Sequence, residues 1–135
     1  MRIKNPKVLA SFPSPGLCEG CGIPCSSRER HHIFGKGAGG PDLRCNIIML
    51  GDAFTDQCAC HAVFHNEGGA VDRFTFLGVV AKREGTTPEA IEDVVNMVRN
   101  RLPKDPSKEQ ILAAMESLEH NGYILAEREL AEYLK

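Results

Sequence analysis

The sequence has no long apolar run and no strong excess of charge of either sign. Its 135 residues contain no apolar stretch near the roughly 20 residues that a bilayer-spanning helix needs, so no membrane segment is expected. The basic start, Met1 to Lys7, is followed by a short apolar piece before Pro13 and Pro15, which argues against a secretory signal peptide. No internal repeat is present. These absences predict one domain-sized protein of the cytoplasm that makes no membrane contact.

The net charge of −2 argues against an obvious nucleic-acid binder, but the charge is unevenly distributed. Residues 1–50 carry seven Lys and Arg against three acids, a net charge of +4. Residues 51–135 carry nine against fifteen, a net charge of −6. A phosphate backbone would therefore approach the first segment. Ordinary solvated faces would give the same distribution.

Histidine and cysteine are concentrated between residues 18 and 65. Four of the five histidines form two clusters, His31-His32 and His61-x-x-x-His65. Cys18-x-x-Cys21 precedes the first cluster, and Cys58-x-Cys60 lies directly before the second. Six cysteines without a secretion signal favour thiolates and metal over disulfides. We therefore predict a metal-dependent active site stabilised by a structural zinc ion.

The predicted zinc ligands are Cys18, Cys21, Cys58 and Cys60. A lone Cys-x-x-Cys would also suit a redox pair, but the second pair forty residues later favours zinc. Cys25 is the alternative to Cys58 as the fourth ligand. Cys45 is predicted to be a small buried residue in a strand.

Residues 31–34 and 43–50 predict two strands of a β-hairpin around a glycine-rich loop. Successive strand residues point to opposite faces, so His31 and His32 are expected to have different roles. A helix is predicted to begin at Thr55 or Asp56 and to run to Gly68. Because positions i and i+4 share a helix face, His61 and His65 would converge on one point.

The flanking segments carry simpler signals. Residues 1–17 contain several prolines and predict an extended basic arm. Residues 70–135 predict a helical C-terminal extension, with helices over 71–84, from Thr87-Pro88 onward, after a capping box at Ser107–Gln110, and over 127–134. Its acidic charge argues against DNA contact, so we expect a docking surface or a homodimer interface there.

Histidines and an amide in this arrangement suit phosphodiester hydrolysis. That reaction needs a base that takes a proton from water and a cation at the scissile phosphate, and neutral histidine suits the first role. A divalent ion held by His31, His61 and His65 would supply the second. The amide of Asn46, on the strand paired with that of His32, would hold the base in one tautomer.

Four pieces in this order resemble the motif of HNH endonucleases, the ββα-metal (His-Me finger) nucleases. They are His31-His32-Ile33, the turn ending Gly39-Gly40-Pro-Asp, Asn46 to Leu50, and Cys60-His61-x-x-x-His65. Cys18-x-x-Cys21 and the cysteine before His61 resemble the zinc-stapled subgroup, so the resemblance covers about residues 18–69. The resemblance implies that His32 is the general base, that His31, His61 and His65 hold the metal, and that Asn46 orients the first strand and the base.

The sequence thus predicts an α+β protein with a zinc-stapled ββα-metal core at 18–69 and a helical tail. We expect an endonuclease that hydrolyses DNA with one divalent cation, Mg²⁺, Mn²⁺, Ni²⁺ or Zn²⁺, in a bacterial or phage-infected cell. Arg30, Lys36 and Arg44 are the predicted phosphate contacts, and Lys36 would equally suit a solvated side chain. The alternative function is a non-catalytic zinc module that binds nucleic acid or protein.

Three of the histidines and the amide of Asn46 also have a simpler interpretation. His31-His32 would suit a surface pair, and His65 would suit the C-terminal end of a helix, where the dipole favours a cation. Asn46 would suit the polar edge of a strand.

Overall fold

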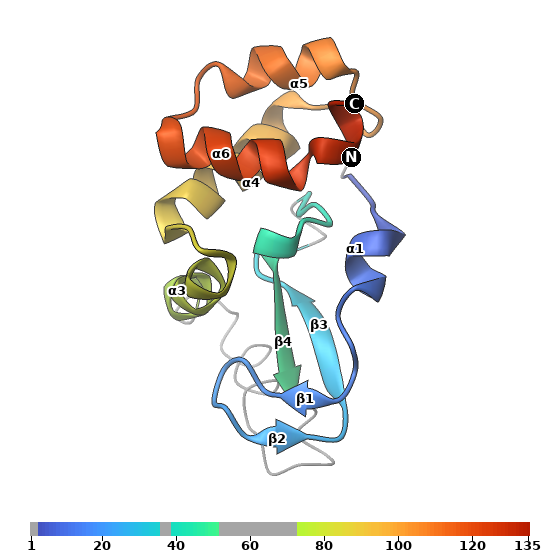
Figure 1. Ribbon diagram of the computed structural model, residues 1–135, viewed down its shortest axis with the longest axis vertical. Helices are drawn as coiled ribbons and strands as arrows, with labels where there is room; N and C mark the ends of the chain where they lie inside the picture. Colours follow the sequence, from blue (N-terminus) through green and yellow to red (C-terminus); the bar gives the residue numbers. More distant parts are fainter. Residues whose placement is uncertain (1–2, 36–38, 52–72) are drawn as a thin grey trace.

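The protein combines a small β-hairpin with several helices, which confirms the predicted α+β class. The computed structural model describes residues 3–35, 39–51 and 73–135. Figure 1 shows the hairpin between α1 and α3, with α4, α5 and α6 above it and a second, smaller hairpin below. The elements are α1 (Pro6–Ala10), β1 (Gly16–Leu17), β2 (Pro24–Cys25), β3 (Arg28–His32), η2 (Arg44–Asn46), β4 (Ile47–Gly51), α3 (Arg73–Glu84), α4 (Pro88–Arg101), α5 (Lys108–Met115), α6 (His120–Glu129) and η3 (Ala131–Tyr133).

Strands β3 and β4 form the predicted antiparallel hairpin, in which His32 pairs with Ile47 and His31 with Ile48. The two paired residues belong to different apolar clusters: Ile47 contributes to a small one beside α1, and Ile48 to the main core. Cross-strand partners share a sheet face. His31 and His32 therefore lie on opposite faces, as predicted.

The strand bounds differ from those predicted. The first strand covers 28–32 rather than 31–34, and residues 44–46 of the second form a 3-10 turn before the strand begins at Ile47. The carboxylate of Glu129 accepts hydrogen bonds from the backbone N–H groups of Arg44 and Cys45. An acid far away in sequence thus caps this turn, which local propensity does not reveal.

The N-terminal segment is not the extended arm that its prolines predict, because it contains α1. The side chain of Asn5 accepts a hydrogen bond from the N–H of Lys7, and Pro6 occupies the first turn, where its missing N–H is not needed. Val8, Leu9 and Phe12 then pack against Ile47 and Met49. The arm covers one face of the β3–β4 hairpin.

The C-terminal region is helical, as predicted, and several of its helix ends lie where expected. Thr87 caps α4, Ser107 and Gln110 form the capping box of α5, and Gly85 follows α3 with a φ of 69°. The last predicted helix, 127–134, is wrong in its bounds. Helix α6 ends at Glu129, and a 3-10 turn over Ala131–Tyr133 follows.

The hairpin and the C-terminal helices share one apolar core. Ile48 and Leu50 of β4 belong to the same buried cluster as Leu77 of α3, Ile91 of α4 and Leu125 of α6. Removing the helices would expose this face of the hairpin to water, at a cost of about 25 cal/mol per Å² of apolar surface. In the ranges that the structure describes, no helix combines the length and apolar character that crossing a bilayer requires.

Candidate active site

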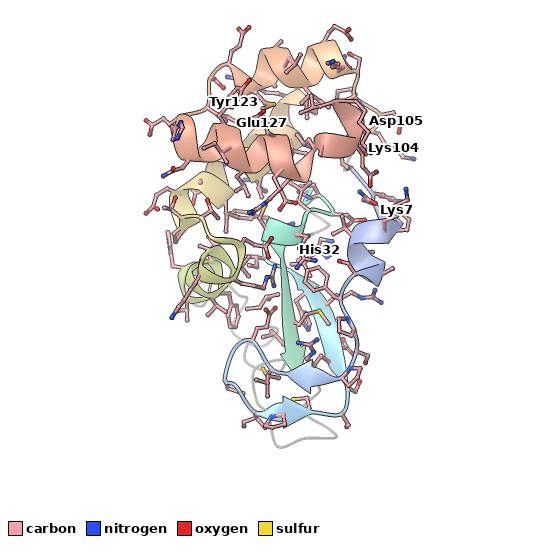
Figure 2. All side chains as sticks on the ribbon, in the orientation of Figure 1. Lys7, His32, Lys104, Asp105, Tyr123 and Glu127 are labelled. Atoms are coloured by element: carbon pink, nitrogen blue, oxygen red, sulfur yellow. The ribbon has the colours of Figure 1, made fainter. Side chains whose placement is uncertain are left out.

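The predicted base lies at the end of β3, beside α1 (Figure 2). His32 is 8% exposed and His31 is 6% exposed, so both rings are largely removed from water. His32 also lines a surface pocket of about 450 Å³, together with Leu9, Ser27, Arg28, Glu29 and Arg30. His32 is thus a largely buried residue that also lines a pocket.

The imidazole of His32 contacts a carboxylate that the sequence did not single out. Its Nε2 lies 2.7 Å from Oδ1 of Asp42, and the two side chains are 5% and 3% exposed. The other oxygen of Asp42 accepts a hydrogen bond of 2.8 Å from the backbone N–H of Asn5, and the N–H of Asp42 donates to the carbonyl of Ile3. The N-terminal segment therefore holds Asp42 in place against His32.

Asn46 is fully buried, and its amide joins the two ends of the loop between the strands. Its Oδ1 accepts from the N–H of Phe34 at 2.8 Å, while its Nδ2 donates to the carbonyls of Phe34 and Pro41 at 3.1 and 3.0 Å. The amide thereby orients the end of the first strand. The ring of His32 itself is contacted by Asp42, so the orienting contact expected of Asn46 reaches the base only through the strand.

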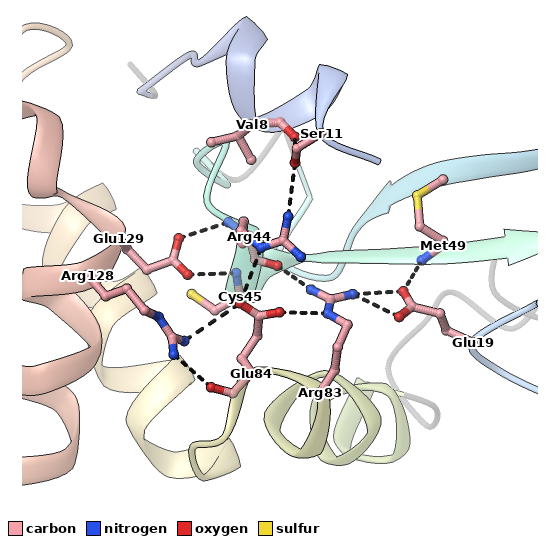
Figure 3. Close-up of polar contacts among 10 residues, drawn as sticks. All are labelled: Val8, Ser11, Glu19, Arg44, Cys45, Met49, Arg83, Glu84, Arg128 and Glu129. Atoms are coloured by element: carbon pink, nitrogen blue, oxygen red, sulfur yellow. Dashed lines mark hydrogen bonds and ion pairs between the residues drawn. The ribbon is translucent and has the colours of Figure 1, made fainter. Parts of the chain in front are cut away.

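Two of the predicted phosphate contacts are engaged within the protein. Arg30 donates to the carbonyl of Leu9 at 2.7 Å. The guanidinium of Arg44 lies 4.6 Å from the ring centroid of Phe12 and donates to Ser11 and Glu84 (Figure 3). Both side chains thus help to hold the hairpin in place, and their DNA contacts stay a prediction. Lys36 lies outside the described residues.

A network of arginines and carboxylates connects the hairpin to the helices (Figure 3). Arg83 binds both carboxylate oxygens of Glu19, Oε2 of Glu84 and the carbonyl of Arg44. Burial alone would lower the pKa of Arg83, but its hydrogen bonds and charge contacts with Glu84 and Glu19 raise it overall. Burial alone would raise the pKa of Glu84, yet Arg83 and Arg44 lower it. Both groups are therefore charged at neutral pH.

Burial dominates the net pKa shift of two neighbouring acidic groups, whose pKa values are raised, unlike that of Glu84. Burial raises the pKa of Glu129, and the hydrogen bonds from the backbone N–H groups of Arg44 and Cys45 offset only part of this increase. It also raises the pKa of the Cys45 thiol well above its usual range, with further contributions from Glu129 and Glu84. Cys45 is therefore a protonated thiol that packs like a small apolar residue, as predicted, although in a 3-10 turn and not in a strand.

The first predicted zinc ligands lie in the turn between β1 and β2. The N–H of Gly22 donates to the carbonyl of Cys18 at 2.7 Å, and the N–H of Cys18 donates to Ile23, which gives a tight knuckle around Cys18-x-x-Cys21. Cys18 is buried and Cys21 is exposed, while Cys25 lies in β2. This turn suits two thiolate ligands of a tetrahedral zinc ion.

The remaining predicted ligands, Cys58, Cys60, His61 and His65, lie outside the described residues, as does the helix expected to carry them. Within the described ranges, no three His, Cys, Asp or Glu side chains form a metal-binding group. The structure therefore describes the half of the predicted site that bears the base, one metal ligand and the buried amide.

Comparison with protein-family models, with characterised proteins and with solved structures finds no match to this chain.

Proposed function

We propose that this protein is a metal-dependent endonuclease that hydrolyses DNA phosphodiester bonds, with His32 as general base. The observation that carries the proposal is the buried contact between Nε2 of His32 and Oδ1 of Asp42 at the rim of a pocket. A carboxylate beside imidazole fixes the tautomer and stabilises the imidazolium that forms when the ring takes a proton. An ordinary surface histidine pair needs no such partner.

The proposed step uses the ring nitrogen that Asp42 does not contact. With the proton of the neutral ring on Nε2, the lone pair lies on Nδ1, which takes the proton from the attacking water. Asn46 binds the backbone N–H and carbonyl of Phe34, two residues after His32, and so helps to hold the end of the strand that carries the base.

His31, His61 and His65 are the proposed ligands of one divalent cation, which when bound would neutralise charge at the scissile phosphate. Imidazole nitrogens suit the transition metals, and Mg²⁺ prefers oxygen ligands, so Mn²⁺, Ni²⁺ and Zn²⁺ fit this donor set better. Cys18, Cys21, Cys58 and Cys60 are the proposed ligands of the structural zinc. The ββα-metal core that the sequence resembles would join β3, β4 and the helix that carries His61.

Cleavage of supercoiled plasmid with EDTA, Mg²⁺, Mn²⁺ or Ni²⁺ tests the proposal. We expect metal-dependent nicking or linearisation, and a loss of about 10²–10⁴-fold in the His32→Ala variant. The matched control is His120→Ala, because His120 lies at the exposed start of α6. No cleavage with any metal by folded, zinc-containing protein would favour the alternative, a non-catalytic zinc module that binds nucleic acid or protein.

The buried pair of His32 and Asp42 would also suit a purely structural ion pair. His32→Gln separates these interpretations, since glutamine keeps a hydrogen-bond donor for Asp42 but is no base at neutral pH. Unchanged thermal stability with lost cleavage supports catalysis. Lost stability together with full cleavage in the remaining folded fraction supports the structural pair.

A further inference from the structure

One arginine of the C-terminal helices lies against the catalytic hairpin. Arg99, in the last turn of α4, places its guanidinium carbon 5.3 Å from the ring centroid of Phe34. A Cβ added at Gly39, at the end of the glycine-rich loop, would lie 3.6 Å from the Cβ of Arg99. Phe34 follows His32 by two residues, so their Cα atoms are within about 7 Å of each other.

Arg99 differs from the other arginines in its hydrogen bonds. Six other arginine side chains each donate at least one hydrogen bond to a carbonyl, hydroxyl or carboxylate group; these are Arg28, Arg30, Arg44, Arg83, Arg101 and Arg128. Among residues 3–35, 39–51 and 73–135, Arg99 has the contact with the Phe34 ring and no hydrogen bond or ion pair. No described residue therefore accepts a hydrogen bond from the five N–H donors of its guanidinium, which suit an anionic ligand.

The ring under Arg99 is held in place from several sides. Phe34 is 4% exposed, and the amide of Asn46 binds both its N–H and its carbonyl. Gly40 packs so closely on the Phe34 carbonyl that any Cβ there would overlap it. A guanidinium that stacks on a fixed ring loses little further freedom when it binds, and its planar fork matches the oxygens of a phosphate.

We propose that Arg99 binds a backbone phosphate of the DNA substrate beside the glycine-rich loop. The substrate class rests on the proposed function, but the phosphate contact itself does not require cleavage. It assigns a nucleic-acid contact to helices whose acidic charge argues against one. Arg99 is a binding residue and contacts no group of the reaction in the described structure.

The salt dependence of DNA binding tests this contact. Fluorescence anisotropy of a short fluorescein-labelled duplex, without added divalent cation, gives the affinity of the full-length wild type and of Arg99→Met between about 50 and 200 mM salt. Methionine keeps the apolar stem over Phe34 and removes the charge. Arg101→Met is the matched control, because it removes the same charge from the same helix turn, and Arg101 instead donates to Ser117.

Each phosphate contact contributes about 0.9 to the slope of log affinity against log salt. We expect Arg99→Met to lower the magnitude of that slope by about this amount. The ratio of wild-type to variant DNA affinity should therefore fall about 3.5-fold between about 50 and 200 mM salt. Arg101→Met should keep the slope, and Arg99→Lys should retain most of it. If Arg99→Met does not fold by circular dichroism, Arg99→Gln carries the same expectation.

An unchanged slope in Arg99→Met, or an equal decrease in Arg101→Met, would show that Arg99 only packs or only adds to the overall charge. A wild type that does not bind the duplex would overturn both the contact and the DNA substrate. Binding with the expected slope change, but no cleavage with any metal, would leave the contact standing and overturn the nuclease.

Discussion

The polar groups around the hairpin form two networks that differ in how far apart their members lie in the sequence. The His32–Asp42 pair and the Asn46 amide join residues separated by at most 12 positions. The network of arginines and glutamates joins Arg83 to Glu19 across 64 positions and Glu129 to Arg44 across 85. The first shapes a loop and places His32, the proposed base, at a pocket, whereas the second fixes the hairpin against the helices. Changes in the first should affect cleavage most, and changes in the second should affect stability.

The largest effect is expected from Asp42→Asn. The amide is nearly isosteric but carries no charge, so it cannot stabilise an imidazolium, and cleavage should fall roughly 100-fold or more. Plasmid cleavage measured beside the free energy of unfolding checks this, with the exposed Asp105→Asn as control. A variant that cleaves at the wild-type rate would make Asp42 a structural residue only.

Gly40→Ala should cost the most stability. The new methyl group would overlap the Phe34 carbonyl, and overpacking of this kind costs about 2–3 kcal/mol of unfolding free energy. Gly35→Ala is the matched control, since its methyl group would meet nothing within 4 Å. Urea unfolding of both variants measures the difference. Equal stability of the two would show that the loop relaxes without loss.

Glu84→Gln should change the pH dependence of stability. Arg83 and Arg44 lower the pKa of Glu84, so its ionised form stabilises the fold at pH values above the usual pKa range of glutamate. This stabilisation is lost as the pH falls through about 4 and below. The wild type should therefore be more stable than the variant by about 1–3 kcal/mol at neutral pH, with a gap that narrows in acid. Urea unfolding at several pH values measures it.

Glu129→Gln provides the comparison of opposite sign. The pKa of Glu129 is raised by burial, so its protonation favours the fold, and the wild type should gain stability relative to this variant as pH falls. If the free energies of unfolding of the wild type and both variants changed in parallel with pH, the assigned pKa directions would be contradicted.

The smallest effect is expected from Thr87→Ala. The hydroxyl of Thr87 accepts a hydrogen bond from the N–H of Ala90, and loss of such a cap costs about 1 kcal/mol. Thr86→Ala, one residue earlier, removes a hydroxyl that caps no helix and serves as control. Thermal unfolding compares them. A cost as large as that of Gly40→Ala would mean that the start of α4 influences the hairpin as well.

The docking or homodimer role expected of the C-terminal helices stays a prediction. Their packing onto β4 and the capping of η2 by Glu129 give them a part in holding the hairpin, whatever else they contact.

Local chemistry in the sequence determined much of this protein. The Thr87 and Ser107 caps, the glycine-rich loop and the alternation that separates His31 from His32 all depend on neighbours within a few residues, so the pattern alone predicted them. The proline pattern does not predict the helix of the N-terminal arm, because the apolar residues of that helix pack on β4, far along the chain. Only the tertiary structure brought Asp42 to His32, Glu129 to η2 and Arg99 to Phe34, since each contact depends on how loop closure and the shared core place segments that no periodicity links.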